Sequence, residues 1–332
     1  MKLHCKAHSL LSRHRPTLIN DHRSRAIFDS NLKWVSGTTL TFSFLGGSNS
    51  FKDALRNAFA RWMQYADIRF TEVAKSGQIR IAFENDGSWS YLGRDILDVP
   101  AGEPTMNIGW SPVSDFDMAL HEVGHGGLAL HHEHQNGGID WNREAVIEEL
   151  SGAPNFWDIT TIERNVLDAI PREQVIGSEV FDDNSIMMYP IPAAWIKSGA
   201  YSRTGINPAG GISVGDQYWA GIVYAKASAP DDPQHIVDAP LEVKLYLARG
   251  KQASIRWQAK EKGSYRITTT GIADTVAVLF VDGKQVAADD DSGEDRNALI
   301  EAELSPESLN EIVVRLYYKN RASELGIRIE RI

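Results

Sequence analysis

The 332-residue sequence predicts an α+β domain, with a mixed twisted sheet and long helices, followed by an all-β sandwich. Three observations support this fold class. Alternating runs and helical runs are interspersed in the first part of the chain, a proline-rich stretch follows, and only alternating runs come after it. We therefore expect a leader or short pro-segment at 1–30, a first domain at 31–228, a linker at 229–240 and the sandwich at 241–332.

The first domain is expected to begin with a strand, a helix and two more strands. Residues 38–45 alternate between apolar and polar types, which predicts a strand. In residues 51–62 apolar side chains recur at i, i+3 and i+4, so we expect a helix there, with Ser50 as its N-cap. Residues 68–73 and 78–83 predict the two further strands. This order indicates a mixed sheet backed by a long helix.

The following segments lead to the helix that carries the chemistry. Pro104–Trp110 is predicted to be a short extended segment whose edge accepts a substrate peptide as an added strand. The next helix is expected to start near Ser114, with Asp117 as its capping partner. Residues 146–176 predict helices and loops without a chemical motif.

The C-terminal part has a different pattern. Residues 228–240 contain three prolines and little apolar content, which is typical of a linker. Beyond them, turn residues such as Asp282-Gly283 separate short alternating runs. Six strands without a helix pattern predict a β-sandwich, at 241–247, 252–258, 263–270, 275–281, 298–304 and 311–318.

The bulk composition is ordinary for a globular protein, with 42% hydrophobic and 23% charged residues and a net charge of −10. This charge disfavours nucleic acid or an anionic membrane as the main partner. No apolar run reaches the roughly 20 residues of a membrane span, and the N-terminus lacks the apolar core of a signal peptide. We expect a monomer that is extracellular by a route without a recognisable signal peptide, and a cytoplasmic location stays open.

Residues 121–134 hold five of the ten histidines and begin with an HExxH motif. Positions i and i+4 of a helix share a face, so His121 and His125 chelate one ion. Glu122 reaches a water that the metal activates and takes its proton as general base. Three imidazoles with one open position make a catalytic zinc site, and His131 is the expected third ligand.

Together with Ser185-Ile-Met187-Met-Tyr189, this motif resembles the metzincin clan of zinc endopeptidases and, within it, the astacin-like bacterial branch. The resemblance spans residues 31–226 and implies a metzincin-like catalytic domain with a zinc cleft. It implies that Met187 lies in a turn beneath the metal. Tyr189 would be a switchable ligand that also donates a hydrogen bond to the developing oxyanion. The zinc ligands and the base that the resemblance implies are His121, His125, His131 and Glu122.

The third ligand has an alternative. The family has a glycine in a left-handed turn three residues after the second histidine, where this chain has Leu128 and places its glycines earlier, at 126 and 127. An alignment without a gap makes His131 the ligand. An alignment with one inserted residue makes it His132. The prediction takes His131, because the distance from the helix limits the reach.

Cys5 is the only cysteine, so no disulfide forms within the chain. Its neighbours His4 and His8 raise the alternative that the thiol blocks the zinc site and keeps the enzyme latent. The other interpretation is a free thiol without a role.

The C-terminal part resembles the bacterial pre-peptidase C-terminal domain, and its loop 287–295 is rich in aspartate. Carboxylate oxygens suit Ca²⁺, so the loop is either a calcium site or a solvated acidic turn. We expect this domain to bind or stabilise rather than to catalyse.

The function that these residues predict is zinc-dependent hydrolysis of peptide bonds in a polypeptide substrate. The alternative is a catalytically weak, metal-bound protein that binds polypeptide or glycan. A third candidate is a hydrolase that acts on a non-peptide amide.

Overall fold

The chain folds into two compact units, Met1–Ser36 with Leu40–Ala225, and Gly37–Thr39 with Lys226–Ile332. The computed structural model describes residues 5–8, 27–29, 32–85, 87–153, 155–171, 175–176, 181–225, 235–237, 240–248, 251–317 and 321–332. Most of the predicted leader and linker therefore lies outside the described residues. Each unit has a hydrophobic core of its own.

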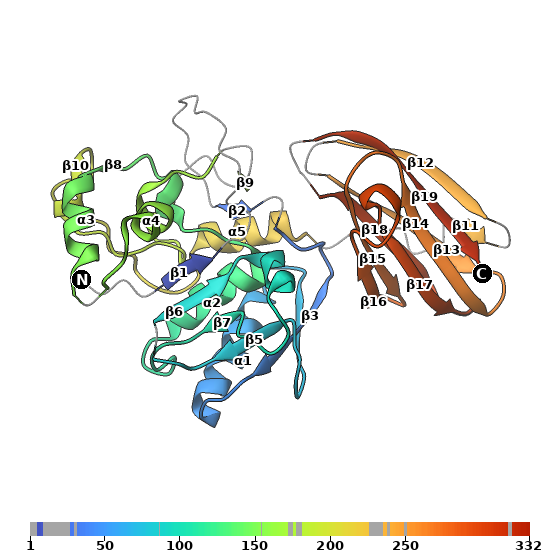
Figure 1. Ribbon diagram of the computed structural model, residues 1–332, viewed down its shortest axis with the longest axis horizontal. Helices are drawn as coiled ribbons and strands as arrows, with labels where there is room; N and C mark the ends of the chain where they lie inside the picture. Colours follow the sequence, from blue (N-terminus) through green and yellow to red (C-terminus); the bar gives the residue numbers. More distant parts are fainter. Residues whose placement is uncertain are drawn as a thin grey trace. The chain divides into compact units, whose positions relative to one another are not determined.

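A six-stranded mixed sheet forms the frame of the first unit, in the order β1-β6-β7-β5-β3-β4 (Figure 1). β3, β5 and β7 run parallel to one another, whereas β6 is antiparallel to β7. β1 adds to β6 in parallel, and the side chain of Cys5 lies outside what the structure describes. The strands are β1 (Cys5–His8), β3 (Thr39–Phe44), β4 (Arg69–Glu72), β5 (Ile79–Ala82), β6 (Ser88–Tyr91) and β7 (Met106–Asn107).

The predicted substrate edge is not an edge of this sheet. β7 (Met106–Asn107) lies within Pro104–Trp110 and pairs on one side with β5 and on the other with β6. Both of its hydrogen-bonding sides are therefore used, so this segment has no room for an added strand. The prediction of Pro104–Trp110 as the substrate edge is wrong.

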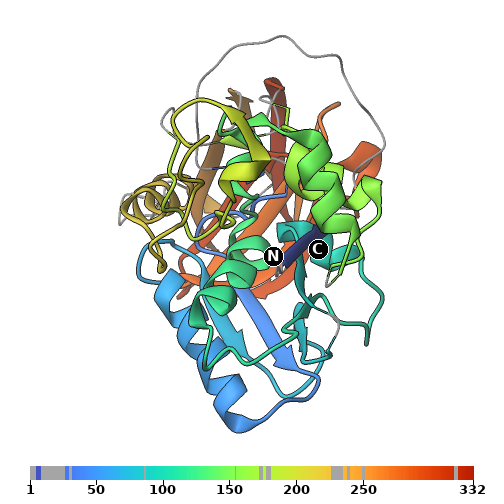
Figure 2. The same cartoon turned by 90° about the vertical axis from the view of Figure 1, so that its left-hand side faces the viewer.

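Two helices, α1 (Asn49–Trp62) and α2 (Phe116–Leu128), lie side by side and pack on the sheet (Figures 1 and 2). The indole of Trp62 donates a 2.9 Å hydrogen bond to the carbonyl of Leu120 and links the two helices. Their caps differ from the predicted ones by one or two positions. In α1 the cap is Ser48, not Ser50, and its side chain accepts a hydrogen bond from Phe51 N. In α2 the cap is Asp115, not Ser114.

Shorter elements complete the first unit around a second cluster of apolar side chains, which includes Trp195 and Tyr189. None of the helices in the described part of the chain is long and apolar enough to cross a membrane. The remaining helices and strands are β2 (Phe28–Asp29), β8 (Asp140–Trp141), α3 (Arg143–Ser151), α4 (Ile159–Ile162), β9 (Val175–Ile176), β10 (Ile196–Ser198) and α5 (Val214–Val223). Short 3₁₀ or π-helical segments lie at Gly93–Asp98, Glu133–Asn136, Glu163–Leu167 and Ala193–Trp195.

The second unit is a sandwich of two sheets, in the orders β11-β13-β18-β15-β16 and β12-β19-β14-β17. It contains all six predicted strands and three more, of which β11 lies in the predicted linker. The core is built from residues that alternate along the strands, as in the buried positions Ile255, Trp257 and Ala259 of β13. The strands are β11 (His235–Val237), β12 (Leu241–Leu247), β13 (Gln252–Ala259), β14 (Gly263–Thr270), β15 (Thr275–Val281), β16 (Lys284–Asp289), β17 (Leu299–Leu304), β18 (Asn310–Leu316) and β19 (Ser323–Arg331).

Candidate metal centre

The helix α2 brings the first two histidines together in the interior of the first unit. From Met118 to Leu128 every residue of this helix is buried, including His121, Glu122 and His125. One helical turn separates the two histidines, and their Nε2 atoms lie 3.1 Å apart. The structure therefore brings the two histidines of the predicted pair close together.

The helix ends one residue later than the family pattern suggests. Ala129 adopts a left-handed conformation, with φ 55° and ψ 39°, and its N–H donates to the carbonyl of His125. The N–H of Leu130 donates to the carbonyl of Gly124, so two carbonyls at the helix end are satisfied in this turn. Gly126 and Gly127 remain helical. A Cβ at Gly126 would lie 2.7 Å from the Ser90 hydroxyl, so close packing, and not a helix break, accounts for this glycine.

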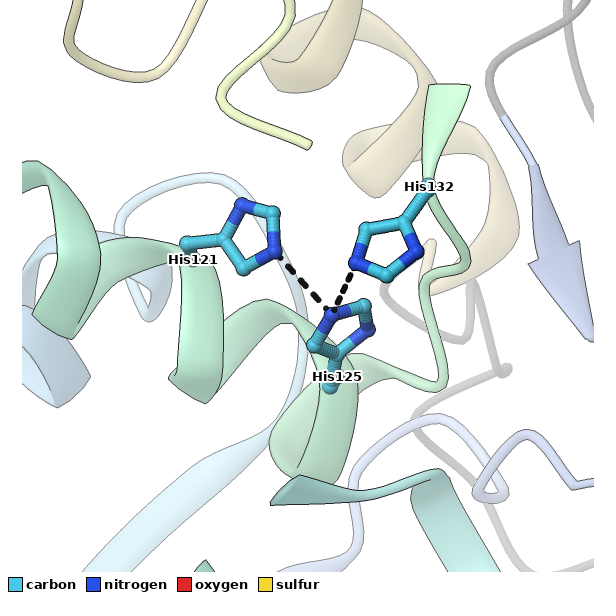
Figure 3. A group of neighbouring side chains, drawn as sticks. All are labelled: His121, His125 and His132. Carbon is cyan, nitrogen blue, oxygen red and sulfur yellow. Dashed lines mark hydrogen bonds between the residues drawn. The ribbon is translucent and has the colours of Figure 1, made fainter. Parts of the chain in front are cut away.

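The turn at Ala129 decides which histidine joins the pair. His132 Nε2 lies 3.2 Å from His125 Nε2, whereas His131 points away and its Nε2 lies 3.0 Å from Asp29 Oδ2. Figure 3 shows His121, His125 and His132 with their rings turned toward one another. The structure thus places His132, and not the predicted His131, in the cluster. The physical reason is the extra helical residue, which shifts the chain after α2 by one position.

The hydrogen bonds of the rings fix which nitrogen faces the centre of the cluster. His121 Nδ1 lies 2.7 Å from the Ile186 carbonyl, and His125 Nδ1 contacts the Leu130 carbonyl. A carbonyl only accepts, so both Nδ1 atoms carry the proton and both Nε2 atoms present a lone pair. Lone pairs pointed at one another repel unless a cation lies between them. Backbone carbonyls that hold metal-ligating imidazoles in this way are a common feature of metal sites.

The spacing of the three nitrogens suits zinc. Two imidazole nitrogens bound to a tetrahedral Zn²⁺ lie about 3.3 Å apart, since each Zn–N distance is ~2.0–2.1 Å. The two distances from His125 Nε2, 3.1 and 3.2 Å, agree with this value. Among the residues that the structure describes, one group of three or more histidine, cysteine or acidic side chains has ligand atoms that all lie within 4.8 Å of one another. This group is His121, His125 and His132.

Burial keeps the imidazoles of His121 and His132 neutral, which is the form that binds metal. Loss of solvation lowers the pKa of His121 to about 4, although the hydrogen bond to Ile186 opposes this shift. Burial also lowers the pKa of His132 well below its ordinary value, and the neighbouring histidines add to the effect. Protons therefore compete weakly with a metal ion for these nitrogens near neutral pH.

A tight turn from Ser185 to Tyr189 lies against the cluster, and α5 holds this turn in place. Asp216 of α5 accepts hydrogen bonds from the Ser185 hydroxyl, 2.7 Å, and from Ile186 N, 2.8 Å. The Ser185 hydroxyl in turn accepts from Met187 N at 3.0 Å. Burial raises the pKa of the Asp216 carboxyl, and the hydrogen bonds it accepts oppose that shift. Sequence reasoning missed Asp216, although the Ser213-x-x-Asp216 capping box was visible.

The predicted Met-turn residue packs directly against the metal-binding helix. Met187 is 1% exposed, and a Cβ placed on Gly124 of α2 would lie 2.6 Å from its sulfur atom. The glycine leaves the space that the Met187 side chain occupies against the helix. This contact fixes the position of the turn that carries Tyr189.

Tyr189 and Glu122 lie beside the cluster. The ring of Tyr189 is 4.3 Å from that of His132 and 4.7 Å from that of His134, measured between centroids. Glu122, Tyr189 and His121 line the same cavity, whose volume is about 200 Å³. The structure therefore brings together four of the five predicted site residues, and His131 is the one that it leaves out.

In the acidic loop of the second unit, the carboxylate of Asp289 is held by hydrogen bonds. Both carboxylate oxygens of Asp289 accept hydrogen bonds, one from the Ser292 hydroxyl in the loop and the other from Leu299 N at the start of β17. Calcium binding by this loop stays a prediction.

Comparison with protein families gives one match in the catalytic part. The model of the astacin family of peptidases matches residues 27–194, which is just over half of the chain. No curated protein matches the chain.

Three solved structures match parts of the chain. The structure of myroilysin has 29% sequence identity and a TM-score of 0.56, and the match covers 60% of this chain and 98% of that chain. A zinc-protease hatching enzyme from the medaka fish Oryzias latipes has 20% identity and a TM-score of 0.41, over 60% and 98% of the two chains. The pre-peptidase C-terminal domain of a Bacillus anthracis collagenase has 10% identity and a TM-score of 0.25, over 31% and 100%.

Proposed function

Because the chain belongs to the astacin family of zinc metalloendopeptidases, we propose that it hydrolyses peptide bonds and that Glu122 is the general base of this reaction. The observation that carries the proposal is the cavity in which Glu122 lies beside His121 and Tyr189. A peptide bond in this cavity would be next to both a carboxylate and the metal-binding nitrogens. This proximity is what general-base attack by water requires.

We assign the zinc ligands as His121, His125 and His132. Three neutral imidazoles leave one position open for water or substrate, which is the arrangement of catalytic zinc sites. The metal, when bound, supplies a Lewis acid that polarises the substrate carbonyl and makes water more acidic. This assignment replaces His131, whose ring nitrogen lies against Asp29.

Glu122 is fully buried on α2, one residue along from His121. Its carboxylate takes a proton from the attacking water and passes it to the leaving amine. The burial of Glu122 strengthens the electrostatic contacts that its carboxylate makes.

Tyr189 is proposed to stabilise the negative charge that develops on the attacked carbonyl oxygen. Its side chain is 4% exposed and packs against His132, so the phenol is held at the cluster. A phenolic O–H aimed at a developing oxyanion lowers the barrier, because its dipole needs no reorganisation during the reaction.

The decisive experiment compares the zinc-loaded wild type with Glu122→Gln in the digestion of casein. We expect Glu122→Gln to keep one zinc per chain and to lose a factor of about 10²–10⁴ in kcat, which is the usual contribution of a general base. Glu144→Gln is the matched control, because Glu144 is exposed on α3 and lies outside the cavity.

Two outcomes would contradict the proposal. A wild type that holds one zinc and cleaves nothing would favour the alternative, a metal-bound protein that binds polypeptide or glycan. Full activity of Glu122→Gln would leave the peptidase but remove Glu122 from its mechanism.

We further propose that the enzyme acts as a monomer outside the cell and that loop 287–295 binds Ca²⁺. The family and the acidic sequence of the loop support these proposals. Light scattering measures the oligomeric state. Fractionation of the producing cells shows where the protein is located. Calorimetric titration of the wild type with Ca²⁺ measures whether the loop binds the ion.

A further inference from the structure

The cavity beside the histidine cluster combines an apolar wall with acidic groups. Its volume is about 200 Å³, and no lysine or arginine is among its lining residues in the described part of the chain. The apolar side chains come from α2, from the Ser185–Tyr189 turn and from the prolines that follow. They are Met118, Ile186, Met188, Pro190 and Pro208, and the acidic side chains are Asp115, Asp117 and Glu122.

Asp115 and Asp117 are held in place by donors that carry no charge. Asp115 accepts from Met118 N at 3.2 Å and from the Trp110 indole at 3.3 Å. Asp117 accepts from Gly211 N at 3.0 Å. Neutral donors orient a carboxylate without cancelling its charge. Within the described part of the chain, no lysine or arginine forms a salt bridge with either residue.

The start of α2 compensates these charges only in part. A helix N-terminus carries a partial charge of roughly +0.5, which stabilises nearby carboxylates. Two full negative charges exceed this value, so the cavity keeps an acidic wall that a cation would neutralise. This wall is distinct from Glu122, which the reaction uses.

We propose that this cavity selects a lysine or arginine side chain of the substrate residue next to the cleaved bond. The methylene stem of such a side chain packs along Met188, Pro190 and Pro208, while its charged head reaches Asp115 and Asp117. The inference rests on the proposed peptidase function, because the cavity adjoins Glu122 and Tyr189. Acidic substrate side chains are disfavoured there by repulsion.

The first test measures cleavage. We expect zinc-loaded wild type to cut a lysine peptide about tenfold faster, in kcat/KM, than the same peptide with uncharged norleucine at that position. A peptide library with mass-spectrometric detection first identifies on which side of the cut the preference lies. In Asp115→Asn/Asp117→Asn the ratio should fall toward one, because asparagine removes the charge, while its one amide oxygen still accepts the hydrogen bond that caps the helix. Asp53→Asn, in an exposed part of α1, is the control and should leave the ratio unchanged.

The second test needs no catalysis, so it separates this inference from the proposed function. Fluorescence anisotropy gives the Kd of the lysine and norleucine peptides for the zinc-loaded Glu122→Gln variant. We expect tighter binding of the lysine peptide, by about tenfold at low salt, and a smaller ratio at ~1 M NaCl. Equal Kd values would overturn the inference whether or not the wild type cleaves peptides. Cleavage by the wild type without a basic preference would overturn it and leave the peptidase function intact.

Discussion

His131 and His132 are neighbours in the sequence, but their side chains leave the chain in different directions. The backbone at His132 is extended, with φ −68° and ψ 129°, and successive side chains of an extended chain point to opposite sides. His132 therefore joins the metal-binding cluster while His131 contacts Asp29. A single position thus separates a proposed metal ligand from a residue that contacts Asp29.

We predict opposite effects of alanine at these two positions. His132→Ala should lose tightly bound zinc, because two imidazoles hold the ion less firmly than three. His131→Ala should keep one zinc per chain and lose about 1 kcal/mol of stability, since it removes one hydrogen bond to Asp29. Metal analysis and urea unfolding of both variants measure these effects. If His131→Ala lost its zinc and His132→Ala kept it, the third ligand would be His131, as the alignment without a gap predicts.

The sequence was sufficient to predict that His121, Glu122, His125 and Tyr189 lie close together. A helical period and a short turn place these residues by local rules. It was not sufficient for the third histidine. Whether the helix ends at residue 127 or 128 depends on how Gly126 and Gly127 pack against Ser90 and Phe70, which are distant in sequence. Ala129 adopts a left-handed conformation, which is more common for glycine. The positions of the glycines in the sequence therefore do not reveal where the helix ends.

At the scale of elements, α5 holds the turn beneath the metal centre through a single carboxylate. Asp216 accepts from Ser185, Ile186 and Ser213, and Ile186 also provides the carbonyl that orients His121. A helix that contributes no side chain to the histidine cluster is therefore connected, through Ile186, to a proposed ligand. Such indirect contacts often affect metal affinity by a factor of about 10–100.

We predict that Asp216→Ala lowers the free energy of unfolding by about 3 kcal/mol, because it leaves buried donors without an acceptor. It should also weaken zinc binding by roughly 10–100-fold, since the Ile186 carbonyl then loses its fixed position. Ser213→Ala is the matched control. It removes the capping hydroxyl from the same helix, at a cost of about 1 kcal/mol, but keeps the bonds from Asp216 to the turn.

Denaturant unfolding and competition with a zinc chelator measure the two quantities. Equal zinc affinities of the wild type and Asp216→Ala would show that α5 stabilises the fold without orienting His121.

The strands illustrate what local patterns predict and what they miss. The six predicted sandwich strands were found because their apolar residues alternate, as in β13 and β14. β16 was missed because its sequence, Lys-Gln-Val-Ala-Ala-Asp, has no alternating apolar pattern and is only partly buried. Its place in the sheet comes from pairing with β15. The inner position of β7 was missed because a local sequence pattern does not show that β7 pairs with both of the strands that precede it, β5 and β6.

At the scale of the whole molecule, metal binding and the sandwich core belong to different units. The histidine cluster lies wholly within the first unit, and the sandwich is held by its own set of buried aliphatic and aromatic side chains. A ligand that binds only the folded form of one unit stabilises that unit by RT ln(1 + [L]/Kd). Zinc should therefore act on one unit and leave the other unchanged.

We predict two thermal transitions in calorimetry of the full chain, of which only one responds to a zinc chelator. With zinc at ~1,000 times its Kd, the first unit gains about 4 kcal/mol, and its Tm should fall by about 8–16 °C when the metal is removed. The sandwich transition should stay in place, because among the described residues the metal-binding group lies outside that unit. His132→Ala provides the control, since its first transition should already be low and should not respond to the chelator. A single transition that shifts as a whole would instead mean that the two units unfold together, and the metal would then stabilise the entire chain.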